Sequence, residues 1–587
     1  MATESFFSNA SLAYLASAGA GKDGKTYSIK PTDGSGDFTF SRGSNLAATR
    51  VGPTGLIEKG RENLLKQSNN FDTTWITPVS ITKTSGQSGY DGSNDAWKIE
   101  SNGVAAYDAV YQYISISGVN TYSVYAKAGT NNIFVLRSAG AVDARAYFNL
   151  SAVSVSVNSS VIDASIESVG NDWYRCSMTF NGANSVVYVY PNELGIASAG
   201  YIYIQDAQLE IGLAATEVIT TGATTGKAGL LEDEPRFDYS GGATCPSLLL
   251  EPERSQLIPN SEYLIDGLTN VTATYNYGTS PDGLNNSTFI LPTTAIAAHR
   301  LSYTDLFTYA PSTSYVASAF LKSGGHRYVT INLALRNSGS FQESAIGFVD
   351  LEQNTIVVNG SNTLWTSLAV FKEEYANGFY RYGVTAKTPS SGSDRVDVQF
   401  NITDENGNSF AGNGTDGVVF YGLQAESGSY PTSYIPNHSG GSVTRGEETT
   451  SALTLPEPLT DNYTLFFDFK EINTVNNWIA FLDSSNNPVY TFFGYSGHYD
   501  VNNGSAYILE SSADPNGKIA LQQSGSSIKV FVNGVNKVKA GATANLTDIV
   551  KFRFGSRNSN NSATLRQMLF FPTALSDEAC IELTTIS

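Results

Sequence analysis

The sequence predicts an all-β chain of tandem β-sandwiches preceded by an extended N-terminal arm. Composition is the first observation: Gly 54, Tyr 33 and Phe 30 stand against Met 3 and only 15% charged residues among 587. Such a composition favours short strands and tight turns over helical bundles. Four landmarks that occur twice in the same order are the second observation. At roughly 150 residues per domain, the length predicts about four units.

Residues 1–60 form the predicted arm. Its apolar run Leu12–Ala20 resembles part of a secretion signal, but Glu4 is the only early charge and Lys22 is the first lysine. A signal peptide needs a basic leading region, so none is expected. No stretch reaches the ~18 consecutive apolar residues of a membrane span, so membrane insertion is not expected either.

The duplicated landmarks predict two copies of one sandwich, at 61–215 and 256–437. Each copy contains short runs of β-branched and aromatic residues, such as Val186–Tyr190, which favour a two-sheet jelly roll. The four landmark pairs are Arg61–Asn69 with Arg254–Glu262, Thr121–Gly129 with Ser314–Gly324, Gly170–Arg175 with Asn377–Arg381, and Tyr203–Glu210 with Phe420–Glu426.

Two connectors and a third sandwich complete the predicted organisation. Residues 216–255 and 438–449 are rich in Gly and Thr and are expected to be linkers outside any core. Residues 450–587 begin with the alternating strand pattern Tyr463–Phe469 and contain the hairpin turn Asn533-Gly534, so another sandwich is predicted there.

Several stretches resemble known families. Lys529–Val535 and Met568–Cys580 resemble the closing strands of laminin-G/concanavalin A-like domains, and the duplicated units resemble the jelly rolls of carbohydrate-binding modules. Three further stretches resemble linker motifs of phage head-fibre, spike and tail proteins. These are Pro31–Glu58, Cys245–Glu262 and Tyr430–Arg445.

The resemblance implies a bacteriophage virion surface protein, a head fibre or spike or a tail fibre, assembled in the host bacterial cytoplasm. Residues 1–60 would anchor it to other virion proteins of the capsid or tail, and host-surface glycans would be its ligands. A homo-oligomer is expected, with a trimer favoured because fibres are usually symmetric. The alternatives are a capsid decoration protein without a ligand, a polysaccharide depolymerase and a secreted adhesin.

Catalysis and nucleic-acid binding are not expected. The four histidines are not spaced as a zinc pair, no Gly-x-Ser-x-Gly elbow occurs, and the Glu-x-Asp-x-x-Glu strand of concanavalin-like glycosidases is absent. A net charge of −19 repels phosphate backbones. Cys176, Cys245 and Cys580 are too far apart for a metal motif and too few for a disulfide framework, so they are expected to be reduced and buried.

Aromatic residues in loops are the candidate sugar-binding positions, since the C–H faces of a pyranose stack on aromatic rings. Trp173–Arg175 and Phe379–Arg381 are also aromatic, but their repetition at one landmark favours a core role. The candidates are Trp478, Tyr495, His498 and Tyr499 in the third sandwich, and Trp97, Tyr107 and Tyr111 in the first.

No cofactor is required by any motif, although calcium is a possible ligand of two Asx-rich turns. Such turns present oxygen atoms of the kind that Ca²⁺ binds, but they are also common without an ion. The candidate ligands are Asp91, Asn94 and Asp95 in one turn, and Asp404 and Asn406 in the other.

Overall fold

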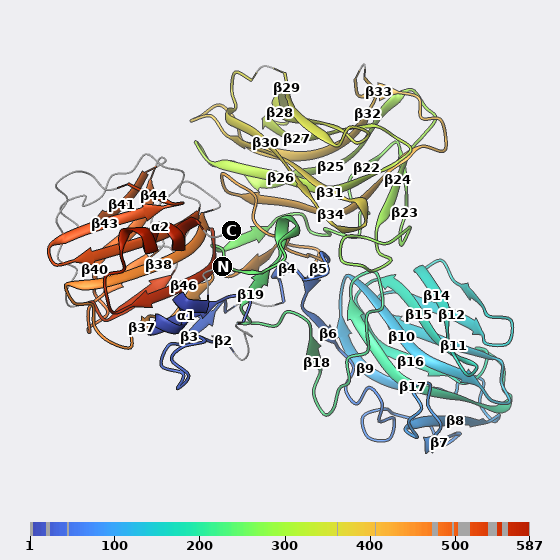
Figure 1. Cartoon of the computed structure of the whole chain (residues 1–587). Helices are drawn as coiled ribbons and strands as arrows, with labels where there is room; N and C mark the ends of the chain where they lie inside the picture. The colour runs from blue at the N-terminus through green and yellow to red at the C-terminus, as the bar shows by residue number, and fades with distance from the viewer. Residues whose placement is uncertain are drawn as a thin grey trace.

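The computed structural model describes residues 4–18, 24–43, 46–360, 362–405, 407–471, 479–495, 498–502, 517–537, 549–554 and 562–585. Figure 1 shows three β-sandwiches around a central junction. The all-β prediction is confirmed. The helices in the described part are α1 (Glu4–Asn9), α2 (Asp577–Thr585) and the 3₁₀ turns η1 (Ser240–Gly242) and η2 (Ala376–Gly378). None of them is long and apolar enough to cross a membrane.

The first sandwich packs a six-stranded sheet against a five-stranded one. The six-stranded order is β14 (Val161–Gly170), β15 (Trp173–Asn181), β10 (Val119–Ala128), β17 (Ala199–Ile211), β8 (Ala96–Asn102) and β7 (Ile81–Gln87). The five-stranded order is β13 (Ser154–Val157), β12 (Asp143–Asn149), β11 (Ile133–Gly140), β16 (Asn184–Tyr190) and β9 (Val110–Ile116). Alternate residues of both sheets, among them Val124, Phe134 and Met178, form the core.

The second sandwich repeats this strand order. The order in one sheet is β30 (Thr366–Glu374), β31 (Tyr380–Lys387), β26 (Ser314–Gly324), β34 (Gly417–Ser427), β24 (Thr288–Pro292) and β23 (Val271–Thr274). The order in the other is β29 (Thr355–Asn359), β28 (Ser340–Asp350), β27 (Tyr328–Asn337), β32 (Arg395–Thr403), β25 (Ala297–Thr308) and β22 (Leu268–Thr269). A short strand, β33 (Ser409–Phe410), also pairs with β25. Strand for strand, the two sandwiches have one topology, apart from the extra strands β22 and β33.

Buried polar side chains explain why the landmarks recur. In the first copy, Glu210 accepts hydrogen bonds from Gln208 (2.6 Å) and from the backbone N–H of Thr216 (2.9 Å), and Arg175 donates to the Thr216 carbonyl. These bonds hold the chain as it leaves the sandwich. The cost of burying Gln208 and Glu210 is offset because the side chains of both are hydrogen-bonded.

The second copy repeats the network with equivalent residues. Glu426 accepts from Gln424 (3.0 Å) and from the Thr432 N–H (2.9 Å), and Arg381 donates to the Thr432 carbonyl (2.7 Å). Trp173 and Phe379, beside these arginines, are both buried. The landmark residues therefore have a structural role in the core, as the sequence predicted.

The third sandwich is assembled from three distant parts of the chain. Its eight-stranded sheet has the order β19 (Arg236–Asp238), β20 (Ser247–Leu250), β46 (Ala563–Phe571), β38 (Asn462–Glu471), β42 (Gly517–Ser524), β43 (Ser527–Val532) and β44 (Val535–Asn536), and β1 (Leu12–Leu15) also pairs with β46. The facing sheet has the order β37 (Leu453–Thr454), β45 (Lys551–Phe554), β39 (Ile479–Leu482), β40 (Pro488–Tyr495) and β41 (His498–Asn502).

The expectation of an extended N-terminal arm is wrong for its described residues. Leu12 pairs with Phe570 of β46, and the buried Leu12 and Tyr14 belong to the core of the third sandwich. Phe6 packs edge-on against Phe571, with 6.4 Å between ring centroids. Further along, β2 (Lys25–Thr26) pairs with β3 (Phe38–Ser41), which pairs with β36 (Thr449–Thr450). The free energy gained by burying these apolar side chains exceeds the conformational entropy that the segment loses when it folds onto the sandwich.

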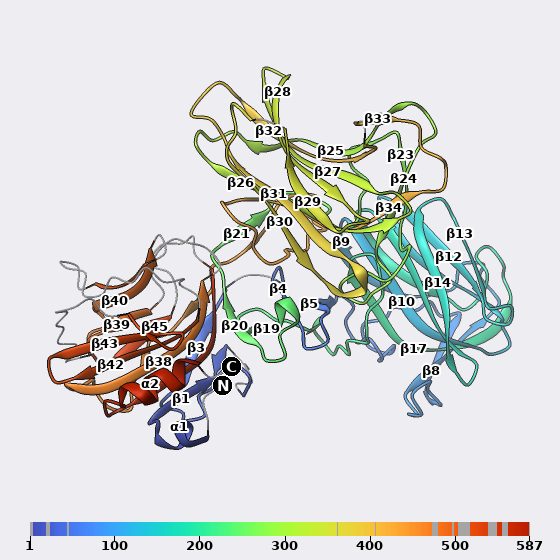
Figure 2. The same cartoon turned by 45° about the horizontal axis from the view of Figure 1, so that its top comes forward.

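The expected linkers are also ordered. Leu248 and Leu250 of β20 are buried in the third core, so residues 216–255 are not a connector outside it. At the roots of the two jelly rolls, β18 (Gly226–Ala228) pairs with β6 (Arg61–Asn63), and β35 (Val443–Arg445) pairs with β21 (Arg254–Gln256). The hairpin β4 (Thr49–Val51) and β5 (Ile57–Lys59) lies at the junction. Both jelly rolls are therefore insertions into the third sandwich, as Figure 2 also shows.

The cysteines differ from one another in burial. Cys176 and Cys580 are buried, whereas Cys245 is half-buried, and all three are free thiols. Burial raises the pKa of Cys580 to about 12, so this thiol is unreactive at neutral pH.

Candidate carbohydrate-binding face

The predicted sugar-binding residues do not gather at one place. Trp478 lies outside the described residues, and Tyr495, His498 and Tyr499 lie on β40 and β41 with side chains outside the described part. Trp97 is only 9% exposed, because it packs in the first core and donates its indole N–H to the Asn69 carbonyl at 3.0 Å. That position does not suit stacking on a sugar.

Tyr107 and Tyr111 belong to one outer surface of the first jelly roll. Val110, Val187, Val189, Ala146 and Phe148 point into the core, so the residues between them on β9, β16 and β12 point outward. Five tyrosines alternate with these core residues, and we name their surface the aromatic face. They are Tyr111, Tyr113, Tyr147, Tyr188 and Tyr190.

The tyrosine rings of the aromatic face form a continuous ladder across two strands. The centroid of Tyr111 lies 5.7 Å from that of Tyr113 and 5.4 Å from that of Tyr188. Tyr188 in turn stacks on Tyr190 at 5.5 Å. Tyr113 is 68% exposed whereas Tyr190 is buried, so the ladder runs from solvent towards the middle of the sheet.

Charged groups lie beside the ladder. The Arg137 guanidinium is 5.3 Å from the Tyr188 centroid, donates to the Tyr190 hydroxyl at 3.2 Å and pairs with Asp143 at 2.7 Å. Partial burial opposes ionisation of Asp143, but hydrogen bonds from Arg145 and Arg137 hold its pKa below the ordinary value. The pair is therefore charged at neutral pH and presents polar edges next to aromatic faces.

Exposed apolar side chains border one end of the aromatic face. Ile76 exchanges two backbone hydrogen bonds with Tyr111, of 2.8 and 3.0 Å, and its side chain is exposed. Tyr107 is 68% exposed on a neighbouring loop, and Ile196 is exposed on another. A bond of 3.0 Å from the Gly195 N–H to the Ala106 carbonyl joins these two loops. Exposed apolar groups gathered in this way are typical of interaction sites.

A small cavity lies at the other end of the aromatic face. Its volume is about 340 Å³. Tyr147 forms one wall, and Asn149, Ser154, Ser156 and Glu193 supply hydroxyl, amide and carboxylate groups. Aromatic rings next to hydrogen-bonding groups meet both needs of a sugar.

The second jelly roll provides an internal comparison. By strand pairing, Gln399 occupies the place of Tyr188, Asn401 that of Tyr190, and Ser302 that of Tyr111. At these three positions the second copy therefore has amides and a hydroxyl instead of rings, whereas Phe348 takes the place of Tyr147 and packs on Tyr328 at 5.3 Å. The two copies keep the same buried network but differ at the positions of the ladder.

Sequence reasoning identified only Tyr111 of the ladder. The signal for two further members was the alternation in Val186–Tyr190, where Val187 and Val189 face the core and Tyr188 and Tyr190 face outward. Tyr113 follows the same two-residue period from Tyr111.

The oxygens of the first candidate calcium turn make hydrogen bonds within the protein. Asp91 accepts from the Ser93 N–H at 3.0 Å, and Asp95 accepts from Gln205 at 2.8 Å, so their oxygens already stabilise the turn. Asn94 is exposed and Asn406 lies outside the described residues. Asp404 makes a backbone bridge to Gly407. No group of three His, Cys, Asp or Glu residues among those described is placed to hold a metal.

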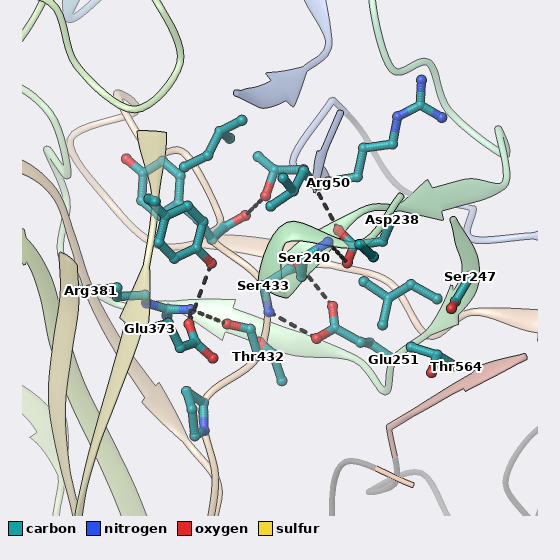
Figure 3. A pocket seen from close by; sticks show the side chains of 18 of the residues that line it. Arg50, Asp238, Ser240, Ser247, Glu251, Glu373, Arg381, Thr432, Ser433 and Thr564 are labelled. Atoms are coloured by element: carbon teal, nitrogen blue, oxygen red, sulfur yellow. Dashed lines mark hydrogen bonds and ion pairs between the residues drawn. The ribbon is translucent and has the colours of Figure 1, made fainter. Parts of the chain in front are cut away.

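A second polar pocket, of about 480 Å³, lies at the junction of the sandwiches (Figure 3). Glu251 on one of its walls accepts from the Ser433 N–H at 2.8 Å and pairs with Arg236 and Arg445, each at 2.8 Å. Arg236 also binds Glu448, with 2.6 Å from Nε to Oε1. These buried charges are paired with one another within the chain. Their role is therefore to hold the sandwiches together at the junction, and they need no ligand to neutralise them.

Acid should weaken this junction. Burial opposes ionisation of Glu251, but Arg445 and Arg236 lower its pKa from 4.5 to about 2. A carboxylate with a depressed folded-state pKa stabilises the fold above its unfolded pKa and loses that effect as pH falls towards the folded pKa. We expect a loss on the order of 3 kcal/mol between pH 5 and 2, measured by urea unfolding. Glu251→Gln should lose less over the same range; an equal loss would contradict the assignment.

Comparisons with known proteins were made for both sequence and structure. No protein-family model and no curated protein matches the chain. Among solved structures, 27 chains match. One is the N-terminal CBM22-1–CBM22-2 tandem of Paenibacillus barcinonensis Xyn10C, with 11% identity over 62% of this chain and 97% of that chain, at a TM-score of 0.21. Another is the LG1-3 region of the laminin α2 chain, with 13% identity over 79% and 95%, at a TM-score of 0.17.

Proposed function

We propose that this protein is a non-catalytic display protein that binds a glycan on the aromatic face of its first jelly roll. One observation carries the proposal. The ladder Tyr113–Tyr111–Tyr188 lies beside the Arg137–Asp143 pair, and the second copy has Ser302 and Gln399 at the positions of Tyr111 and Tyr188.

The geometry suits a chain of sugar units. The Tyr111 ring is tilted by 37° to that of Tyr188 and meets Tyr113 edge to face at 88°, so the row offers separate ring faces on which pyranose C–H faces can stack. Arg137 and Asp143 supply donors and acceptors at the ring edges, where sugar hydroxyls lie. Tyrosine keeps few rotatable bonds, so ordering these side chains on binding costs little entropy.

Replacing Tyr113 with alanine is the direct test. Because this ring is exposed and lies outside the core, we expect the melting temperature to stay within about 2 °C of the wild type. Affinity for the best ligand found on a glycan array should fall about tenfold or more, the loss expected on removing a stacking partner worth roughly 1–2 kcal/mol. Isothermal titration calorimetry measures it.

Tyr277→Ala is the matched control, since Tyr277 is an exposed tyrosine of the second jelly roll, away from the aromatic face. It should bind as the wild type does. Equal binding by the Tyr113 and Tyr277 variants would reject the aromatic face as the site, and a glycan array without any ligand would favour the capsid decoration alternative.

We further propose that the protein is displayed on a phage particle, as a head fibre or spike or a tail fibre. Support comes from the three phage-like linker motifs. Because described residues of the predicted arm are folded into the third sandwich, that sandwich would be the end that meets other virion proteins. Display in many copies, with a trimer favoured, would raise avidity by ~10²–10⁴ over one weak site. Imaging of whole virions tests this placement.

A further inference from the structure

A third cavity, which we name the inter-roll cavity, lies between the two jelly rolls. Its volume is about 490 Å³. The first jelly roll contributes Ile211 at the end of β17, the second contributes Asn286 and His438, and Lys59 comes from the hairpin at the junction. A cavity of this size matches a small sugar or a similar metabolite.

Direct contacts between the jelly rolls hold its walls together. Asn276 of the second roll donates to Asp163 of the first at 2.8 Å and to the Leu213 carbonyl at 3.0 Å. Tyr263 packs in one apolar cluster with Val119 and Leu213. The cavity is therefore a preformed feature of the tandem, and neither roll could form it alone.

Buried ionic groups line the floor of the inter-roll cavity. Lys59 lies 2.9 Å from Glu262 and 3.0 Å from Asp282, and His438 Nε2 lies 3.3 Å from Glu262. Burial opposes ionisation of Glu262, yet Lys59 and His438 hold its pKa well below the ordinary value. Of the lysines, arginines and carboxylates that line the cavity, three are cations and four are carboxylates, so the carboxylates are in excess by one; they are Lys59, Arg61, Lys227, Glu62, Glu210, Glu232 and Glu262.

Two buried polar atoms on the cavity wall have no partner in the part of the chain that the structure describes. Asn286 Nδ2 donates to Asp282 at 3.1 Å, which fixes its amide orientation and leaves Oδ1 unpaired. His438 Nε2 lies 3.3 Å from Glu262, and His438 Nδ1 has no partner among the described residues. Asn286 is 2% exposed, and the His438 side chain 8%. Unpaired buried polar atoms of this kind call for a ligand or water that pairs with them.

We propose that the inter-roll cavity binds a small polyhydroxyl compound with a protonated amine, such as a hexosamine. Its ammonium group neutralises the excess negative charge, and its N–H and O–H groups pair with Asn286 Oδ1 and His438 Nδ1. Apolar side chains, including Ile211, contact the carbon face of the ring. This site is separate from the aromatic face and does not depend on it.

Calorimetry with the full chain at neutral pH tests the proposal, with D-glucosamine as the probe and D-glucose as the polyol without the amine. We expect saturable binding of D-glucosamine and at least about tenfold weaker binding of D-glucose. Ile211→Trp fills the cavity without removing a hydrogen-bonding side chain, since Ile211 is 57% exposed. It should weaken D-glucosamine binding about tenfold or more at an unchanged melting temperature.

Asn286→Leu is the second variant and removes the unpaired acceptor Asn286 Oδ1. It should weaken D-glucosamine binding more than it weakens D-glucose binding. Tyr113→Ala should leave D-glucosamine binding unchanged, which separates this site from the aromatic face. Three results would each overturn the proposal: equal affinity for the two sugars, no saturable heat from D-glucosamine, or wild-type binding by Ile211→Trp. The absence of saturable heat would mean that water alone fills the cavity.

Discussion

Replacing Arg236 with alanine is expected to destabilise the chain by about 3–5 kcal/mol, because two buried carboxylates would lose their shared cation. Arg236 has no exposed side-chain surface, and it pairs with Glu251 and Glu448. It also donates to the Thr49 carbonyl at 2.9 Å and to the Ser433 hydroxyl at 2.6 Å. One guanidinium thus joins β4, the residue that follows β20, the exit of the second jelly roll and the segment between β35 and β36.

Urea unfolding followed by tryptophan fluorescence measures this loss. Lys227→Ala is the matched control, since its pair with Glu232 is 2.7 Å long but both side chains are more than a third exposed. Exposed pairs contribute roughly 0–1 kcal/mol, so this variant should unfold close to the wild type. Similar midpoints for the Arg236 and Lys227 variants would show that the junction does not depend on the buried charge network.

Deleting residues 1–18 is expected to unfold the third sandwich selectively. The deletion removes strand β1 from the edge of β46 and takes the buried Phe6, Leu12 and Tyr14 from two apolar clusters. Each such side chain contributes roughly 1.5–3 kcal/mol by burial, and the lost strand pairing adds to that sum. The total approaches the roughly 5–15 kcal/mol that stabilises a typical domain.

Hydrogen exchange read by mass spectrometry locates the effect. In the deleted chain, amides of β38 and β46 should lose protection, while those of β10 and β26, in the cores of the jelly rolls, should keep most of theirs. Addition of a peptide spanning residues 4–18 should restore protection in β46. Unchanged protection of β46 would mean that the N-terminal segment is a dispensable attachment, as the arm interpretation supposed.

Local patterns were sufficient for several predictions. Short β-branched and aromatic runs predicted strands, and the repeated landmarks predicted one sandwich occurring twice. Glu210 and Glu426 illustrate why: each bonds to residues within a few positions along the chain, at Gln208 and Thr216 or at Gln424 and Thr432. Interactions of such short range leave a pattern that a single sequence reveals.

Partly exposed tyrosines illustrate the limit of that reasoning. Loop position and Gly content singled out Trp97 with Tyr107 and Tyr111, yet Trp97 points into the core. The two-residue period shows which residues share a side of a strand, but the packing of the second sheet decides which side is buried. Tyr188 became a candidate only after its strand was placed beside β9.

The sequence by itself determined that this protein is all-β, duplicated and rich in aromatic strands, because period and composition are local properties. Only the tertiary structure decided that Leu12 and Leu248 complete a sandwich whose other strands begin after residue 449, so that both jelly rolls are insertions. It likewise decided that Asn286 and His438 share a cavity with Ile211. Such pairings close loops of hundreds of residues, and nothing in a local pattern specifies which distant strand edge or wall a segment meets.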